Sequence, residues 1–303
     1  MATTKSWIKA ARPRTLPLAL SGILLGCGLA WFYGEINALV CVLAIITATL
    51  IQVFSNFAND YGDSQKGTDN QFRLGPTRTV QSGEISPKEM KSGMFLIGGL
   101  SFLFGIWLVY EGTRHSSPSA FFSFLGLGIL SLVAAYFYTA GKKSYGYVGL
   151  GDLAVFLFFG LLPVLGVFYL NAGYLDENII HLALTMGFFS TGVLNLNNMR
   201  DVDNDKNSGK ITLPVRMGQR NSRIYHTALI LFGWWAAVIF TVHQRASAWQ
   251  WLFLLVAPLF IRDLVQIWKI ADPRLLDPFL KRLALSTLAF TLLFCFGLIM
   301  ATV

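Results

Sequence analysis

Two clusters of carboxylate and amide side chains each come at the end of a long apolar run. The first cluster is Asn56-Phe-Ala-Asn-Asp-Tyr-Gly-Asp63, and the second is Asn197-Asn-Met-Arg-Asp-Val-Asp-Asn-Asp205. Carboxylates beside a membrane-like segment are costly in free energy unless they hold something cationic. Because the two clusters are alike in layout but far apart in the sequence, they predict one shared site for a divalent metal ion.

Within each cluster, an asparagine and two aspartates recur at about the helical repeat. The residues concerned are Asn56, Asp60 and Asp63 in the first cluster and Asn197, Asp201 and Asp205 in the second. A helix would place each set on one face. Oxygen ligands at a helix end suit Mg²⁺, which binds through one or two carboxylates and leaves room for water and phosphate oxygens. A solvated, capped helix end is the alternative for either cluster alone, but two matched clusters favour the metal.

Basic residues accompany both clusters. They are Lys66, Arg73 and Arg78 after the first, Lys206, Lys210 and Arg216 around the second, and Lys142 in the loop between. A Mg²⁺–diphosphate complex needs this mixture, because carboxylates hold the metal, the metal bridges phosphate oxygens, and Lys or Arg neutralises the remaining charge. The alternative is that the positive-inside rule places these cations regardless of chemistry. We therefore prefer Lys66, Arg78 and Lys210 as diphosphate ligands over the other three flanking residues.

The elements that position these residues are those of a polytopic membrane protein. Of 303 residues, 54% are hydrophobic and 13% are charged, whereas a soluble domain carries about 25% charged residues. Apolar stretches long enough to cross, or nearly cross, about 30 Å of hydrocarbon recur along the chain. They predict an all-α fold, a single transmembrane domain over 1–303 with spans near 16–33, 37–58, 93–110, 119–138, 153–170, 179–196, 224–242, 248–268 and 283–303. Arg262 and Asp263 interrupt the eighth span.

The net charge of +8 is explained by topology rather than by nucleic-acid binding. With nine spans and a cytoplasmic N-terminus, Lys and Arg fall almost entirely in the inner segments, and the outer loops hold only Arg114 and Arg245. This bias predicts that the N-terminus is inside and the C-terminus outside. The long inner loops, 59–92, 139–152 and 197–223, place the chemistry on the cytoplasmic side. The first and third of these loops are weakly similar, which is typical of a site between two related bundles.

The motifs resemble the signatures of the UbiA-type intramembrane prenyltransferases. The first signature corresponds to Asn56-x-x-Asn-Asp-Tyr-x-Asp63-x-x-Lys66-Gly-x-Asp69 and Arg78-x-x-Gln-Ser-Gly83. The second corresponds to Asn198, Arg200, Asp201, Asp205 and Gly209-Lys210-x-Thr-Leu-Pro-Val-Arg-x-Gly218. Shorter matches are Tyr138-x-x-x-Lys142, Tyr145-Gly-Tyr-x-Gly-Leu-Gly-Asp152 and Arg12-Pro-Arg-Thr-Leu-Pro17; Gly141-Lys-Lys-Ser144 departs from the family's Gly-Pro-like pattern. The resemblance covers about the whole chain, and two long signatures are more specific than one short motif.

The resemblance implies a nine-helix bundle in which the two Asp motifs face each other across a central cavity. The residues that would hold Mg²⁺ on a diphosphate are Asp60, Asp63, Asp201 and Asp205, assisted by Asn56 or Asn59 and by Asn197 or Asn198. The residues that would contact the diphosphate are Lys66, Arg78, Lys142 and Lys210. Tyr138 would lie near the breaking C–O bond. An apolar tunnel open to lipid would take the isoprenoid tail, and Phe156-Leu-Phe-Phe159 would line it or pack against lipid.

Among these enzymes the chain looks most like the branch that prenylates 1,4-dihydroxy-2-naphthoate in the cytoplasmic (inner) membrane. That reaction takes a polyprenyl group from an allylic polyprenyl diphosphate, loses CO₂ and pyrophosphate, and gives demethylmenaquinone. Other acceptors, such as 4-hydroxybenzoate or homogentisate, remain alternatives. So does a cation transporter, although transporters usually place acids near the bilayer midplane. Arg12, Arg14 and the loop at 145–147 are candidates for binding the aromatic acid. The isoprenoid length and the oligomeric state are not predicted.

Overall fold

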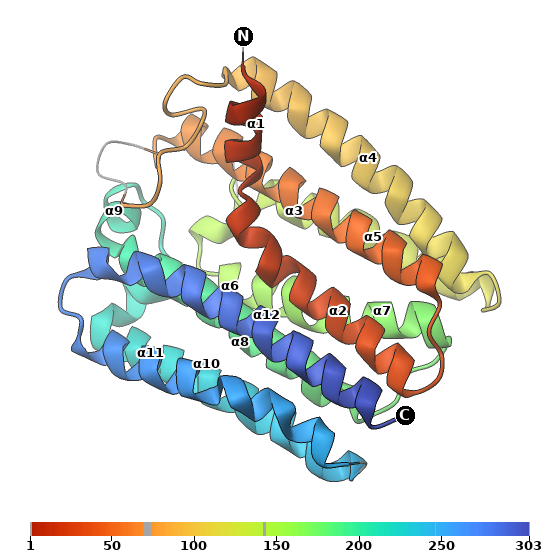
Figure 1. Cartoon of the computed structure of the whole chain (residues 1–303). Helices are drawn as coiled ribbons and strands as arrows, with labels where there is room; N and C mark the ends of the chain where they lie inside the picture. Colours follow the sequence, from red (N-terminus) through yellow and green to blue (C-terminus); the bar gives the residue numbers. More distant parts are fainter. Residues whose placement is uncertain (1, 70–73, 142–143, 246, 303) are drawn as a thin grey trace.

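A bundle of long helices makes up the computed structural model of the protein, which describes residues 2–69, 74–141, 144–245 and 247–302 (Figure 1). Nine helical segments in these ranges are long and apolar enough to cross a membrane, so the predicted all-α membrane fold is confirmed. In chain order they are α1 (Thr4–Ala11) with η1 (Pro13–Thr15) and α2 (Leu16–Phe32), α3 (Ala38–Lys66), α4 (Pro87–Thr113), α5 (Pro118–Phe137), α6 (Gly151–Val155) with η3 (Phe156–Leu161) and α7 (Leu162–Ala172), α8 (Ile179–Arg200), α10 (Leu213–Gln244), η4 (Ala248–Val256) with α11 (Ala257–Lys269), and η5 (Pro273–Leu276) with α12 (Asp277–Met300). Two short helices, η2 (Tyr145–Tyr147) and α9 (Val202–Asn207), lie in loops.

Local sequence signals set several helix boundaries. α4 begins with a capping box, in which the Ser86 hydroxyl accepts from the Glu89 N–H and the Glu89 carboxylate accepts from the Ser86 N–H. This arrangement satisfies two backbone donors that a helix start leaves free. α3 ends at Lys66 and is capped by Gly67, whose φ of 69° is the left-handed conformation common after a helix. The first Asp motif therefore occupies the last three turns of one uninterrupted helix.

The helices differ greatly in how deeply they are buried. α8 packs against α2, α7, α10, α12 and η3, and fifteen of its residues are buried. In α5, by contrast, Ala120 is the one buried residue, so this helix lies at the periphery with apolar side chains facing outward. The central position of α8 carries the start of the second Asp motif to the middle of one end of the bundle.

The Phe-rich stretch near the start of the fifth span forms a π-helical segment, η3. It touches α8 through glycines: a Cβ on Gly160 would lie 2.2 Å from the Gly187 Cα, and one on Gly187 would lie 2.7 Å from the Phe156 ring. Phe156 also makes an edge contact with Phe188, with ring centroids 5.1 Å apart. Phe156 is therefore a packing residue between helices, and the role of the stretch as a tunnel lining stays a prediction.

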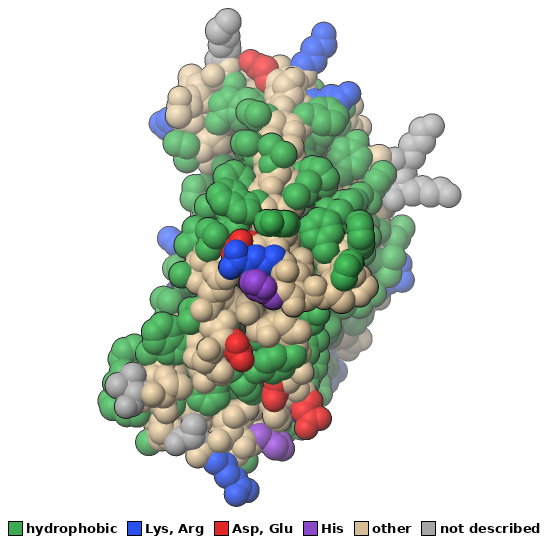
Figure 2. Space-filling view, turned by 90° about the vertical axis from the view of Figure 1, so that its right-hand side faces the viewer, with side chains coloured by type: hydrophobic (Ala, Val, Ile, Leu, Met, Phe, Trp, Pro, Cys, Tyr) green, Lys and Arg blue, Asp and Glu red, His purple; other side chains and the backbone are tan. Residues whose placement is uncertain are grey.

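The long loops gather at one end of the bundle. In Figure 1 this is the end that carries α9, and the short loops lie at the opposite end, near the C-terminus. Hydrogen bonds tie the long loops together: the Asn204 side chain donates to the Thr68 carbonyl at 3.1 Å, and the Ile211 N–H donates to the Tyr147 carbonyl at 2.9 Å. Viewed from the short-loop side, the surface mixes hydrophobic side chains with other side chains and backbone, and a few charged side chains are scattered over it (Figure 2).

Two details of the sequence prediction need correction. Asn197, Asp201 and Asp205 do not share one continuous helix, because α8 ends at Arg200 and Asp201 has the non-helical angles φ −95° and ψ 12°. The seventh span begins earlier than expected, at Leu213, and Gly218 breaks its helical geometry with φ 75° and ψ 171°. In both places local backbone turns interrupt a pattern that looked regular in sequence.

Candidate active site

The first Asp motif is held by cations from two other segments. Asp60 is 1% exposed, and its Oδ1 atom accepts from Arg12 and lies 3.4 Å from an Arg78 nitrogen. Its Oδ2 atom accepts from the Thr79 hydroxyl at 3.1 Å. A buried carboxylate needs this kind of pairing to remain charged. The predicted proximity of Arg78 to the motif is thus observed, and Arg12 is a partner that the sequence did not identify.

The two asparagines of this motif bind neighbouring backbone and side chains. Asn56 donates to the Ala11 carbonyl at 2.9 Å and to the Thr15 hydroxyl at 3.1 Å. Asn59 accepts from the Thr139 hydroxyl at 3.1 Å. Asn56 therefore anchors the N-terminal segment over the motif, and Asn59 anchors the segment that follows α5. Their predicted roles beside a metal or substrate stay predictions.

Asp63 faces a different set of groups. It is 7% exposed and accepts from the Tyr147 hydroxyl at 2.8 Å. The Lys66 ammonium lies 4.1 Å from the centre of the Tyr147 ring and donates to the Ser144 hydroxyl. Burial, followed by the negative charge of Asp63, raises the pKa of Tyr147, so this phenol remains a donor. The loop that departs from the family pattern thus supplies Ser144 and Tyr147 to the first motif.

The second Asp motif has its own arginine. Arg200 is 1% exposed and donates a two-nitrogen fork to Asp201, at 2.9 and 2.6 Å. It also donates to Asp277 at the start of α12 and to Asn197 at 2.9 Å. Such fork-to-fork pairs fix both position and orientation. Asp201 and Asn197 are therefore held rigidly against the end of α8.

Asp205 lies beside Lys210, whose Nζ atom is 3.4 Å from Oδ1. The Asp205 Oδ2 atom and the Asn198 Oδ1 atom are both buried without a hydrogen-bond partner among the described residues. Burial is the main cause that raises the pKa of Asp205 to about 6, against the opposing charge of Lys210. Burial would by itself lower the pKa of Lys210, but the charges of Asp205, Asp63 and Asp201 outweigh it and the pKa is raised. Lys210 therefore stays a cation.

The two motifs come together at Tyr147 and Lys210. Lys210 lies 5.9 Å from the centre of the ring whose hydroxyl donates to Asp63, and the charges of both Asp63 and Asp205 act on it. Segments more than a hundred residues apart in sequence thus converge on one cation and one phenol. This convergence is the arrangement that the two distant clusters predicted.

Tyr138 lies close to this convergence. Its pKa is raised by burial and then by the charges of Asp152, Asp63 and Asp205, so carboxylates of both motifs are near the ring. Its carbonyl accepts from the Gly146 N–H at 3.0 Å, where an added Cβ would come within 2.6 Å of the same oxygen. Tyr145 makes an edge contact with the ring at 5.5 Å. Lys142 and Arg73 lie outside the described residues.

The donor set fits a hard cation such as Mg²⁺. Asp205 and Asn198 offer buried oxygen atoms that bond to nothing among the described residues, and carboxylate and amide oxygens are the ligands that Mg²⁺ takes. In the described part of the chain no three His, Cys, Asp or Glu residues are already gathered as a metal cluster. Arg12 and Arg200 already pair with Asp60 and Asp201. Asp63 and Asp205 are therefore the carboxylates more available to bind a metal ion.

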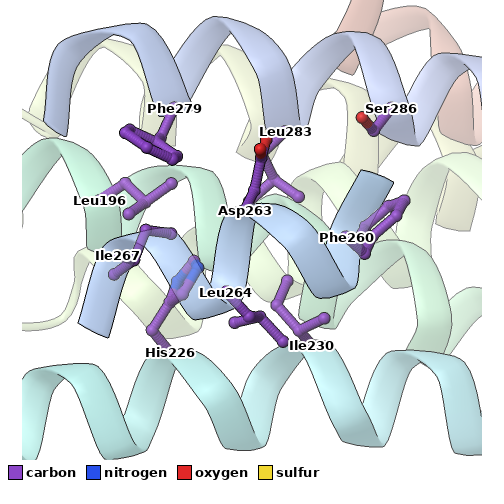
Figure 3. Close-up of a pocket in the computed structure, with 10 residues that line it drawn as sticks. All are labelled: Leu196, His226, Ile230, Phe260, Asp263, Leu264, Ile267, Phe279, Leu283 and Ser286. Carbon is purple, nitrogen blue, oxygen red and sulfur yellow. The ribbon is translucent and has the colours of Figure 1, made fainter. Parts of the chain in front are cut away.

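A separate pocket lies between α8, α10, α11 and α12 (Figure 3). It contains none of the predicted site residues; its polar members are His226, Asp263 and Ser286, among apolar side chains such as Phe260 and Phe279. Asp263, which interrupts the eighth span, accepts from Arg262 at 2.9 Å and from Arg282 at 3.3 Å. Ion pairing therefore explains how this acid is accommodated in an apolar segment.

Sequence reasoning missed most of the residues that support the aspartates. Arg12 and Tyr147 were considered only for the aromatic acid, while Thr79, Ser144 and Asn204 were not considered. Arg12 adopts a left-handed conformation, with φ 51°, between α1 and Pro13. An arginine before a proline near a helix end was a usable signal for an unusual backbone, but its target, Asp60, could not be read from the sequence.

The fold and the converging carboxylate motifs define a multi-pass membrane protein with an acidic and basic site at one end of the bundle. The UbiA prenyltransferase family model matches residues 19–288, and the chain belongs to this family. It is similar to the 1,4-dihydroxy-2-naphthoate octaprenyltransferases of Escherichia coli (strain K12), at 42% identity over 98% of this chain and 96% of that protein, and of Haemophilus influenzae, at 43% over 97% and 96%.

Solved structures share the fold. An apo UbiA homolog from Aeropyrum pernix K1 has a TM-score of 0.67 with 16% identity and covers 100% of both chains. A UbiA homolog from Archaeoglobus fulgidus bound to GPP and Mg²⁺ has a TM-score of 0.63 with 16% identity and covers 97% of this chain and 99% of that one. The predicted family membership and nine-helix architecture are confirmed.

Proposed function

We propose that the protein transfers a polyprenyl group from an allylic polyprenyl diphosphate to 1,4-dihydroxy-2-naphthoate, with release of CO₂ and pyrophosphate. The similarity to two octaprenyltransferases of that name extends over nearly the full length of all three chains. The observation that carries the proposal is the convergence of Asp63 and Asp205 on Tyr147 and Lys210. This end of the bundle combines the acidic and basic groups that a metal–diphosphate requires.

Mg²⁺ is the proposed cofactor, with Asp63 and Asp205 as its first protein ligands and Asp60 and Asp201 as further ones. The homolog from Archaeoglobus fulgidus binds GPP together with Mg²⁺. When bound, the ion would neutralise phosphate charge and stabilise the pyrophosphate leaving group. Lys210, Lys66 and Arg78 would pair with the remaining phosphate oxygens. Lys142 belongs to the same proposed set.

The residues of this chain then support ionisation of the allylic C–O bond. The basic side chains stabilise the charge that develops on pyrophosphate. The aromatic face of Tyr138 stabilises the allylic cation by roughly 0.5–2 kcal/mol. The electron-rich naphthoate ring bonds to the allylic carbon, and its carboxylate leaves as CO₂. Packing of the surrounding helices excludes water, which would otherwise capture the cation.

The proposed location is the cytoplasmic (inner) membrane, with the N-terminus and the site on the cytoplasmic side. The support is charge placement: the end that carries the Asp motifs also carries most Lys and Arg residues of the chain. In the short loops at the other end, Arg114 pairs with Glu111 at 3.3 Å. Such an asymmetry predicts orientation.

The direct test uses purified full-length protein in detergent with an allylic polyprenyl diphosphate and Mg²⁺. Prenylated product and pyrophosphate are measured with 1,4-dihydroxy-2-naphthoate, 4-hydroxybenzoate and homogentisate as acceptors. Of the three acceptors, we expect only the naphthoate to be prenylated. Turnover should be lost when EDTA removes the metal. Preference for another acid would contradict the acceptor assignment, and pyrophosphate release that ignores EDTA would contradict the metal.

A further inference from the structure

One buried carboxylate near the candidate site has no cationic partner among the described residues. Asp152 is the second residue of α6 and is 6% exposed. Its Oδ2 atom has no hydrogen-bond partner among the described residues, and Tyr225 of α10 is a neighbouring side chain that interacts with the carboxylate. Four other buried aspartates lie against a basic side chain; these pairs are Asp60 with Arg12, Asp201 with Arg200, Asp205 with Lys210 and Asp263 with Arg262. Asp63 accepts from the Tyr147 hydroxyl, and the charge of Lys66 acts on it.

Asp152 lies near Tyr138, and its backbone contacts α8 two helical turns before Asn198 of the second Asp motif. An added Cβ on the adjoining Gly151 would lie 3.1 Å from the Tyr138 hydroxyl. The Thr191 hydroxyl donates to the Asp152 carbonyl at 3.5 Å. Thr191 precedes Asn198 by two helical turns, which is about 10 Å along α8. The organic part of an allylic diphosphate, held by its phosphates at the motifs, would extend toward this depth.

In the described part of the chain no counterion lies beside Asp152, and this determines which chemistry the carboxylate can perform. A carboxylate held against Arg or Lys is stabilised in its charged form and is suited to binding a metal. A buried carboxyl group with only a neutral tyrosine beside it can gain and lose a proton at modest cost, which suits general acid–base chemistry. A purely structural role is the alternative, because an acid in the first turn of α6 interacts favourably with the helix dipole. That role does not require Asp152 to lie apart from the described cations or near Tyr138.

We infer that Asp152 is the general base that activates the aromatic acceptor, an inference that rests on the proposed function. As the ring carbon that bears the carboxylate bonds to the allylic carbon, Asp152 takes the proton of the neighbouring ring hydroxyl, and that oxygen becomes a ketone. The carbon–carboxylate bond then breaks, CO₂ leaves, and its electron pair restores the aromatic ring. Asp152 returns the proton to the oxygen. The allylic C–O bond is the other bond broken, and pyrophosphate carries away its electrons.

The experiment separates ionisation of the diphosphate from activation of the acceptor. Full-length Asp152→Asn enzyme is assayed for prenyl transfer to the naphthoate. In parallel, positional isotope exchange of the bridging oxygen of the allylic diphosphate is followed with Mg²⁺ and no acceptor. We expect kcat for transfer to fall roughly 10²–10⁴-fold, because one proton transfer is lost. The rate of isotope exchange and the KM for the diphosphate should change by no more than about twofold, because neither depends on that proton transfer.

Controls make the outcome specific. Asp203→Asn removes an exposed acid from α9 and should leave all parameters unchanged. Asp152→Glu keeps a base and should retain the acidic limb of the kcat–pH profile, which Asp152→Asn should lose; it also serves if the Asn variant does not fold. Near-normal transfer by Asp152→Asn, or equal losses in transfer and isotope exchange, would overturn the inference. A wild-type enzyme that shows neither reaction would instead refute the proposed function.

Discussion

The two aspartate motifs use the same residue types in different structural settings. The first ends an unbroken helix, α3, and its Asp60 takes Arg12 from a segment 48 residues away. The second straddles a helix break, and its Asp201 takes the adjacent Arg200. The other aspartate of the first motif, Asp63, accepts from Tyr147, and that of the second, Asp205, lies beside Lys210. The comparison teaches that arginine-held aspartates shape each motif, while the remaining two, Asp63 and Asp205, are the metal ligands that we propose.

The largest effect should come from the two aspartates that have no arginine partner among the described residues. Asp63→Asn and Asp205→Asn each remove a proposed metal ligand, and loss of about 4 kcal/mol of transition-state stabilisation would reduce kcat roughly 10³-fold. Pyrophosphate release at saturating Mg²⁺ measures this, with Asp203→Asn as the matched control. If one variant retained most of its activity, the motifs would not contribute equally to a shared site.

The next effect concerns folding rather than catalysis. Arg200→Met leaves Asp201 buried without its cation, and breaking such a pair costs about 3–5 kcal/mol. We expect a clear drop in thermal unfolding temperature in detergent. Arg12→Met should cost less, because Arg78 still lies beside Asp60 and the Arg12 side chain is 12% exposed. Equal destabilisation by both variants would remove the proposed difference between the motifs.

A smaller effect should follow from Tyr147→Phe, which removes the hydroxyl on Asp63 and keeps the ring beside Lys66 and Lys210. A lost hydrogen bond to a charged group is worth about 1.5–3 kcal/mol, so activity should fall roughly tenfold to a hundredfold. Tyr145→Phe is the control, since its hydroxyl donates to the Ala134 carbonyl at 2.8 Å. A larger loss in the Tyr145 variant would show that loop shape matters more than the contact with Asp63.

The smallest effect is a pH dependence specific to the second motif. The pKa of Asp205 is raised to about 6, chiefly by burial, so its carboxylate is ionised above that pH and protonated below it. Mg²⁺ must displace the proton at lower pH, and the apparent Mg²⁺ affinity should fall by up to about tenfold per pH unit below 6. Mg²⁺ titrations from pH 5 to 8 measure this. In Asp205→Asn the pH dependence of the apparent Mg²⁺ affinity should flatten. If the slope of affinity against pH were unchanged, another group would be the one that titrates.

Much of the fold could be predicted because membrane helices are encoded locally. Each span is a long apolar run, and its backbone groups must bond within the helix when water is absent. The first motif's shared face also followed from spacing alone, since α3 continues to Lys66. The second motif did not follow in the same way: Asp201 leaves the helix, and nothing in the spacing of its acids indicates that break.

The sequence by itself determined the class of the protein, the nine spans, the acidic motifs and the basic residues near them, because periodicity and composition act over short distances. Tertiary structure alone decided the partners: that Arg12 lies on Asp60, that Tyr147 and Lys210 join the motifs, and that no described cation pairs with Asp152. Such pairings depend on how segments far apart in sequence pack around α8, and the energy of a buried charge depends on every group that surrounds it.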